Sequence, residues 1–331
     1  MAAPPVVDLP FIDEGLAADV ASGLDAVEKM LRTSADSQDA FVAEASKHLI
    51  EAGGKRFRAM IVLLASHFGD FRAPGVIPGA VVIELTHLAT LYHDDVMDEA
   101  RVRRGSASAN ALWDNKVAIL TGDYLFAQAS EILADLGPEL VRIQARTFSR
   151  LVRGQIRETI GPRPGVDAVT HYIEVLADKT GSLIATSGRF GALLSGATPE
   201  VVERLTSACE AIGVAFQLRD DLLDVASTAG ESGKTPGTDL REGIRTLPVL
   251  YVLASTDSGD ARLRELLSGP VAEDDVAEAV ELLRANQAMV RARAELMSWI
   301  GRARDDLMTL PDIPARAALL SLCDYVADRS G

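Results

Sequence analysis

The sequence contains few of the residues that characterise several classes of protein. Its two cysteines, Cys209 and Cys323, lie in apolar surroundings, which indicates reduced core residues rather than a disulfide framework. Aromatic residues make up only 5% of the chain, and no segment shows the sustained alternation of a β-strand bounded by hairpin turns. The net charge of −15, without a large basic face, argues against nucleic-acid binding.

Signals for membranes and export are also missing. The first residues, MAAPPVVDLPFIDEG, have neither a basic start nor an apolar core, so we expect no secretory signal. No apolar run approaches the roughly 20 residues needed to span a bilayer. The expected location is therefore cytoplasmic.

The residues that are abundant favour helices, because Ala, Leu, Glu, Arg and Asp dominate the composition. Several predicted helices are apolar on most faces, which is typical of helices inside a bundle. We predict an all-α fold: a single large helical bundle over 13–331, with a largely apolar central cavity and a flexible lead at 1–12. Amphipathic segments are separated by turn-forming breaks and run over 13–33, 36–51, 56–69, 78–98, 115–136, 138–160 and 198–226.

Two acidic clusters with the pattern DDxxD, at 94–98 and 220–224, end apolar helices. Asp94 and Asp98 share one helix face, as do Asp220 and Asp224, and carboxylates at this spacing repel each other. The negative end of the helix dipole adds to that cost. A bound Mg²⁺ ion would offset it, because Mg²⁺ takes one or two protein carboxylates together with substrate phosphates. The alternative is a pair of solvated helix ends.

A basic segment complements these clusters. Gly53-Gly54-Lys55-Arg56-Phe57-Arg58 opens a predicted helix after a glycine pair, and a helix N-terminus with three cations suits a diphosphate. Arg101, Arg103 and Arg104 follow the first acidic cluster directly. A solvated loop is the alternative for the first segment.

Taken in order, these motifs resemble the trans-isoprenyl diphosphate synthase family, whose members make farnesyl, geranylgeranyl and longer polyprenyl diphosphates. The resemblance runs from about residue 50 to 250 and suggests a long-chain member. It rests on GGKRFR, DDVMD, RRG at 103–105, Gly122-Asp123, Gly154-Gln155, Lys179-Thr180-Gly181, FQLRDDLLD at 216–224, Gly233-Lys234 and Thr246-Leu247-Pro248.

The resemblance implies a magnesium-dependent prenyltransferase that joins isopentenyl diphosphate head to tail to an allylic diphosphate. By matching position, Mg²⁺ (about three ions per site) would be held by Asp94, Asp98 and Asp220, supported by Asp95 and Asp224. Isopentenyl diphosphate would be bound by Lys55, Arg58, His87 and Arg104. The allylic diphosphate would be bound by Arg103, Lys179, Thr180, Gln217 and Lys234. Without the resemblance, His87 reads as a core histidine.

Two positions depart from the family pattern. Ala59 stands where a proline often follows the basic segment, which affects only the entry to the helix. Ile244 stands where a lysine commonly precedes Thr246, so one contact to the allylic diphosphate is lost or passes to Arg245.

Product length depends on the helix that enters the first acidic cluster. Ala89 and Thr90 stand five and four residues before Asp94, where relatives with short products usually carry an aromatic residue. Each helical turn adds about 5.4 Å of depth, comparable to one isoprene unit, so small side chains there predict a product of about C30 to C50. Phe148, on one helix face with Gln155, is the candidate cavity floor, with simple core packing as the alternative.

Three alternatives remain open at this point. A geranylgeranyl diphosphate synthase would be blocked deeper in the cavity. A non-catalytic regulatory subunit of a heteromeric synthase should lack one of the motifs, and a class I terpene cyclase should lack the basic segment and the second acidic cluster. The family resemblance implies a homodimer. A long apolar product favours peripheral membrane contact for its release, although no basic amphipathic anchor is visible.

Overall fold

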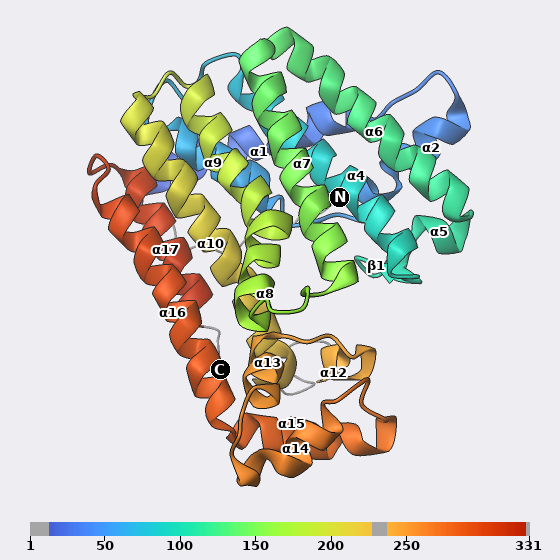
Figure 1. Cartoon of the computed structure of the whole chain (residues 1–331). Coiled ribbons are helices and arrows are strands. Elements are labelled where there is room, and N and C mark those ends of the chain that lie inside the picture. The colour runs from blue at the N-terminus through green and yellow to red at the C-terminus, as the bar shows by residue number, and fades with distance from the viewer. Residues whose placement is uncertain (1–12, 227–236, 329–331) are drawn as a thin grey trace. The chain divides into compact units, whose positions relative to one another are not determined.

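The structure, a computed structural model, describes residues 13–226 and 237–328, and these are almost entirely helical (Figure 1). They form two compact units. Of the described residues, the first unit comprises 13–148, 183–206 and 308–319, and the second comprises 149–182, 207–226, 237–307 and 320–328. The all-α prediction is confirmed; a single domain over 13–331 stays a prediction.

The first unit is built around helix α4, Val76–Met97, which packs against α1, α3 and α6. Side chains on nearly every face of α4 are buried. The elements of this unit are α1 Glu14–Ser34, α2 Ala40–Glu51, α3 Phe57–Ser66, α4, the strands β1 Val102–Arg103 and β2 Ser106–Ala107, α5 Ala109–Leu112, α6 Asn115–Leu136, most of α9 Ser182–Leu194 and parts of three helices shared with the second unit.

The three shared helices are α7 Pro138–Ile160, α10 Pro199–Ala226 and α17 Pro314–Asp328. The second unit also has its own apolar core, in which Val225, Leu240 and Val252 are buried with residues of α14 and α15. Its remaining elements are α8 Ala168–Leu176, the π-helical turn η1 Ala177–Gly181, α12 Thr238–Glu242, α13 Leu247–Leu253, η2 Ser258–Asp260, α14 Ala261–Leu266, η3 Glu273–Asp275, α15 Val276–Ala285 and α16 Gln287–Met308.

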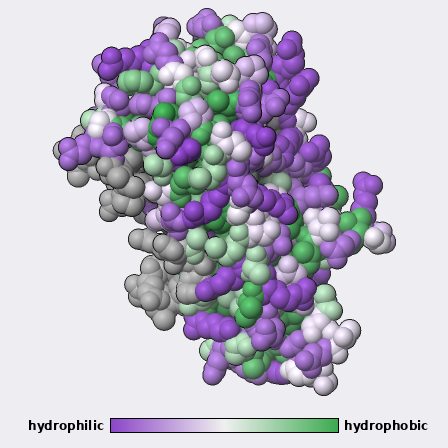
Figure 2. All heavy atoms as spheres, turned by 90° about the vertical axis from the view of Figure 1, so that its left-hand side faces the viewer, coloured by the Kyte–Doolittle hydropathy of each residue, from purple (hydrophilic) through white to green (hydrophobic). Residues whose placement is uncertain are grey.

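Helix α4 corrects one expectation from the sequence. Among the described residues it is the one helix long and apolar enough to cross a membrane, so the statement that no apolar run approaches that length was wrong. The apolar surface of α4 is instead covered by α1, α3 and α6, and most of the helix is buried. On the face shown in Figure 2, hydrophobic side chains are interspersed among hydrophilic ones.

Local sequence signals account for the helix that packs most closely on α4. Asp114 caps α6, since its carboxylate accepts a hydrogen bond of 2.8 Å from the backbone N–H of Val117. Gly122 then allows α6 to approach α4. A Cβ atom at this position would lie 2.3 Å from Nε2 of His93 and 3.0 Å from the carbonyl oxygen of Ala89. This glycine therefore fixes how closely α6 lies against the end of α4 that carries the first acidic cluster.

Candidate active site

The first acidic cluster occupies the last turn of α4. Asp98 is the C-cap residue, and its backbone N–H donates to the carbonyl of Asp94 at 2.8 Å. Asp94 is half-buried and Asp98 is exposed, whereas Asp95 is fully buried. The two predicted ligands that share a helix face thus reach the surface, and the residue between them points inward.

Asp95 connects the cluster to the β1–β2 hairpin. Its Oδ1 accepts a hydrogen bond of 2.6 Å from Nε of Arg103, and its carbonyl accepts from the side chain of Asn110 at 3.0 Å. Burial raises the pKa of Asp95, although the ion pair with Arg103 opposes this shift. Oδ2 of Asp95 is buried without a hydrogen-bond partner. Asp95 therefore holds Arg103, the predicted diphosphate ligand, directly beside the acidic cluster.

The basic segment adopts a left-handed turn before α3. Arg56, the N-cap residue of α3, has φ of 47°, and Gly54 has φ of 145°. The guanidinium of Arg104 donates to the carbonyl of Leu49 at 2.8 Å and also to the carbonyl of Gly53. A Cβ atom at Gly54 would lie only 2.9 Å from Cζ of Arg104. Gly54 is required here both for its positive φ and for the space that Arg104 occupies.

His87 lies among arginines. Burial, followed by the charges of Arg58, Arg104, Arg56 and Arg103, lowers the pKa of His87 well below its usual range. The imidazole is therefore neutral near pH 7 and can donate one hydrogen bond. Nε of Arg58 is buried without a partner. Of the four residues predicted to bind isopentenyl diphosphate, Arg58, His87 and Arg104 are thus brought close together, and Lys55 is exposed at the same turn.

Glu84 balances this positive charge from inside the first unit. Its side chain is almost fully buried on α4, accepts a hydrogen bond of 3.0 Å from the backbone N–H of Ala59, and lies 3.9 Å from Arg56. Sequence reasoning missed Glu84 because a single acid in an apolar helix gives no motif.

We expect Glu84→Ala to lower the free energy of unfolding by about 2 kcal/mol, because it removes the acceptor of the buried backbone N–H of Ala59. It also removes a negative charge 3.9 Å from Arg56, which keeps its closer ion pair with Glu28 at 2.8 Å. Urea denaturation followed by circular dichroism measures the change. Glu99→Ala is the matched control, since Glu99 is exposed beyond the end of α4. Equal stability of the two variants would contradict the role given to Glu84.

The second acidic cluster ends α10 in the second unit. Asp220 is exposed and lies 3.8 Å from Arg219. Asp224 accepts hydrogen bonds of 3.1 Å from the backbone N–H groups of both Thr238 and Asp239. Asp224 therefore holds the first turn of α12, a role that its predicted function as a supporting metal residue did not include.

Asp221 is the member of this cluster that sequence reasoning left without a role. Its carboxyl group is buried, Oδ1 accepts a weak hydrogen bond of 3.3 Å from Gln217, and Oδ2 has no partner. Burial, then the charges of Asp239, Asp224 and Glu158, raise its pKa well above the usual range. Gln217, predicted to bind the allylic diphosphate, is thus placed beside the second cluster.

Lys179 and Thr180 stand on the π-helical turn η1, also in the second unit, and both are half-buried. Nζ of Lys179 donates to Oε2 of Glu158 at 2.5 Å. Lys234, the remaining predicted diphosphate ligand, lies outside the described residues. Arg245 is exposed, as is its neighbour Ile244 at the position of the family lysine.

The donor set of the acidic clusters suits a divalent cation. Within the described ranges, no three histidine, cysteine or carboxylate side chains gather into a complete metal site. Mg²⁺ does not require one, because it usually takes one or two carboxylates and completes its shell with water and substrate phosphates. The half-buried Asp94 and the exposed Asp98 and Asp220 can supply one or two such carboxylates at each cluster. The residues therefore fit Mg²⁺.

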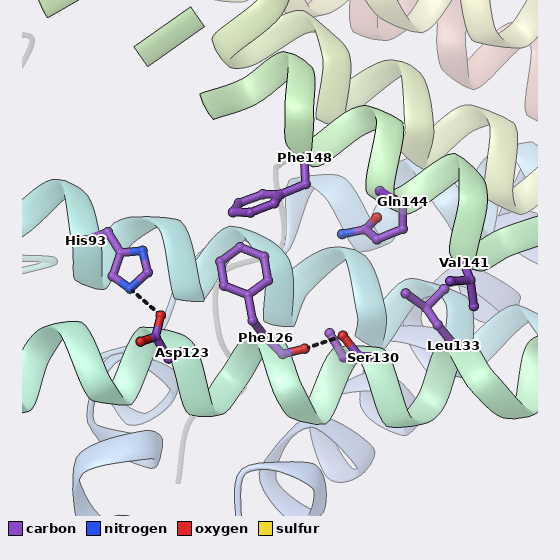
Figure 3. A pocket seen from close by; sticks show the side chains of 10 residues that line it. His93, Asp123, Phe126, Ser130, Leu133, Val141, Gln144 and Phe148 are labelled. Carbon is purple, nitrogen blue, oxygen red and sulfur yellow. Dashed lines mark hydrogen bonds and ion pairs between the residues drawn. The ribbon is translucent and has the colours of Figure 1, made fainter. Parts of the chain in front are cut away.

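A pocket of about 440 Å³ lies among α4, α6 and α7 in the first unit (Figure 3). Phe126 and Phe148 face each other there with ring centroids 4.2 Å apart, and His93 lies 3.4 Å from Asp123. The lining is mostly apolar and includes Ala129, Leu133, Val141 and Ala145. Phe148, the predicted cavity floor, thus lines a pocket, while Ala89 and Thr90 are buried in α4.

Comparison with known proteins places this arrangement in a family. The polyprenyl synthetase family model matches residues 39–283. A nonaprenyl diphosphate synthase of Mycobacterium tuberculosis is 50% identical over 321 residues, which cover 96% of each chain.

Solved structures agree with this match. A geranylgeranyl pyrophosphate synthase of Corynebacterium glutamicum, complexed with calcium and isoprenyl diphosphate, has a TM-score of 0.88 and 45% identity, covering 97% of this chain and 99% of its own. A decaprenyl diphosphate synthase of Rhodobacter capsulatus has a TM-score of 0.87 and 34% identity, covering 96% and 99%. The predicted resemblance, isoprenoid-synthase fold and enzymatic activity are confirmed. The chain belongs to the polyprenyl synthetase family and is a prenyl diphosphate synthase.

Proposed function

We propose that the enzyme elongates an allylic diphosphate with isopentenyl diphosphate to an all-trans product of about C30 to C50, with one isoprene unit extending roughly one helical turn. The observation that carries the activity lies in the first unit of a chain of this family, where Arg103 joins the acidic end of α4 to a half-buried arginine–histidine cluster. The members of this cluster are Arg58, His87 and Arg104. Small side chains at Ala89 and Thr90 support the long product, as do relatives named for nonaprenyl and decaprenyl diphosphate.

Asp94, Asp98 and Asp220 would hold about three Mg²⁺ ions, with Asp95 and Asp224 in support. Bound Mg²⁺ would neutralise charge on the leaving diphosphate as the allylic C–O bond breaks. Cationic and neutral polar side chains of the enzyme would orient the allylic diphosphate and stabilise the negative charge that develops on it. These are Arg103, Lys179 and Lys234, together with Thr180 and Gln217.

The second substrate would bind at the arginine cluster of the first unit. Arg58 and Arg104 would bind its diphosphate with Lys55, and neutral His87 would donate a hydrogen bond. Apolar side chains around the allylic cation would exclude water until the isopentenyl double bond attacks. A new carbon–carbon bond then forms, and the proton lost from the isopentenyl unit passes to the departed diphosphate, by analogy with the family.

We further propose that the enzyme is a homodimer located in the cytoplasm, and that it contacts the membrane peripherally when the apolar product leaves. The runner-up is a geranylgeranyl diphosphate synthase, favoured by the similarity to the Corynebacterium glutamicum enzyme of that name.

A product-sizing assay tests this function. The purified chain is incubated with Mg²⁺, radiolabelled isopentenyl diphosphate and, separately, C5, C10, C15 and C20 allylic primers, and the dephosphorylated products are separated by reversed-phase chromatography. We expect Mg²⁺-dependent products longer than C20, including products from the C20 primer. Accumulation of C20 without further extension would favour the runner-up, and no product with any primer would refute the proposed activity.

A further inference from the structure

Two arginines of α7, Arg150 and Arg153, form ion pairs with Asp178 on the π-helical turn η1, and these three residues are called the clamp. Asp178, the residue before Lys179, is buried, with its side chain 8% exposed. Its Oδ1 accepts a hydrogen bond of 3.0 Å from Nε of Arg150, and its Oδ2 accepts one of 2.8 Å from Nε of Arg153. Both oxygens of this carboxylate are thus bound by arginines one helical turn apart on α7.

Arg150 and Asp178 make further hydrogen bonds to neighbouring residues. A terminal nitrogen of Arg150 also donates to Oε1 of Glu210 on α10 at 2.5 Å and to the carbonyl of Ala177 at 3.4 Å. On the other side, the carbonyl of Asp178 accepts from Oγ of Ser182 at 2.6 Å. Asp178 is therefore fixed through both its side chain and its backbone.

A glycine brings the two elements together. Gly154 lies one residue after Arg153, and a Cβ atom at this position would be 2.7 Å from the backbone nitrogen of Lys179 and 3.1 Å from the carbonyl carbon of Asp178. Any other residue would push η1 away from α7. The close approach and the clamp act on the same turn.

The shape of the turn also points to function. A π-helical turn widens the backbone by one residue, is rare, and is frequently found at functional sites. Here it carries Lys179 and Thr180. Nζ of Lys179 lies 2.5 Å from Oε2 of Glu158. Glu158 is a half-exposed carboxylate on α7, one helical turn after Gly154. α7 thus supplies the arginines that fix the turn and the acid that pairs with its lysine.

We propose that Asp178 is a positioning residue for the allylic diphosphate. Held by Arg150 and Arg153, it fixes the turn that presents Lys179 and Thr180 to that diphosphate. The inference rests on the proposed function, because it assumes that these two residues bind the allylic substrate. The clamp lies wholly in the second unit, whereas the arginine–histidine cluster for isopentenyl diphosphate lies in the first. Its loss should therefore affect one substrate and spare the other.

Asp178→Asn and Arg153→Ala test the clamp. Asp178→Asn keeps the side-chain shape and removes the charge, and the Arg153 side chain is 58% exposed, so its removal leaves no cavity. We expect each variant to raise KM for the allylic primer about tenfold, since small misplacements of binding groups have effects of this order or larger. KM for isopentenyl diphosphate should stay unchanged. Arg153→Lys should recover part of the loss.

A binding measurement separates positioning from general damage. Calorimetric titration with an unreactive allylic thiolodiphosphate in Mg²⁺ should show the same rise in Kd, with an unchanged melting temperature for Arg153→Ala. Arg146→Ala is the matched control, an exposed arginine earlier on α7 and outside the clamp. Unchanged allylic constants, or equal rises for both substrates, would overturn the inference. Wild-type protein that makes no prenyl product would instead refute the proposed function.

Discussion

Replacing Asp94 and Asp220 together by alanine is expected to reduce kcat at least about 10³-fold, because loss of one preorganised charge-stabilising group alone costs about 10² to 10³. Each residue begins its DDxxD cluster, and the two clusters belong to different units. If both hold Mg²⁺ around one diphosphate, either single variant should already lose most activity, and the double variant should lose less than the product of the two single losses.

The measurement is incorporation of labelled isopentenyl diphosphate under saturating Mg²⁺ and substrates. Asp135→Ala serves as the control, since Asp135 is an exposed aspartate on α6 that belongs to neither cluster. The melting temperatures of the Asp94 and Asp220 variants are measured alongside, so that lost turnover in a folded protein is assigned to the site. Turnover that survives the double substitution would remove the basis of the proposed mechanism.

The helices that carry these clusters were predictable because their ends carry local signals. The predicted ranges 115–136 and 138–160 coincide with α6 and α7, since Asp114 caps the first helix and Gly137-Pro138 separates the two. The helix predicted over 36–51 begins only at Ala40, because Asp39 is its capping residue. Such signals act over three or four residues and can be read without tertiary structure.

Features that depend on distant residues could not be predicted in this way. Asp178 and Arg150 are 28 residues apart, on separate elements, and no spacing rule links them. The β1–β2 hairpin was missed because each strand has two residues, too few for an alternating pattern. Likewise, the DDxxD pattern does not reveal that Asp224 caps α12. Motif spacing located the functional residues, and tertiary contacts assigned them further roles.

A phenylalanine near the first acidic cluster, at position 89 or 90, is expected to change the length of the product. The structure favours position 90. Ala89 is fully buried, and its carbonyl faces the close contact between α4 and α6 at Gly122, so a phenylalanine at 89 would strain the packing. Thr90 is slightly more exposed, and its hydroxyl donates only to the carbonyl of His87 in its own helix. Thr90→Phe is therefore the better of the two and is expected to shorten the main product to about C20 or below, because a ring one turn before Asp94 blocks the path of the chain.

A longer product is expected from a substitution in the pocket among α4, α6 and α7. The Phe148 ring packs at a tilt against Phe126 there, and its removal opens space continuous with the pocket. If Phe148 is the cavity floor, Phe148→Ala lengthens the product by about one or two isoprene units, each roughly a helical turn deep. Chromatography of dephosphorylated products measures both shifts, with Phe41→Ala, an exposed aromatic on α2, as control. If Thr90→Phe shortens the product and Phe148→Ala leaves it unchanged, the chain ends elsewhere, and Phe148 is a packing residue. If neither variant changes the distribution, the path along α4 is wrong, because a growing chain that passes Thr90 must meet a ring placed there.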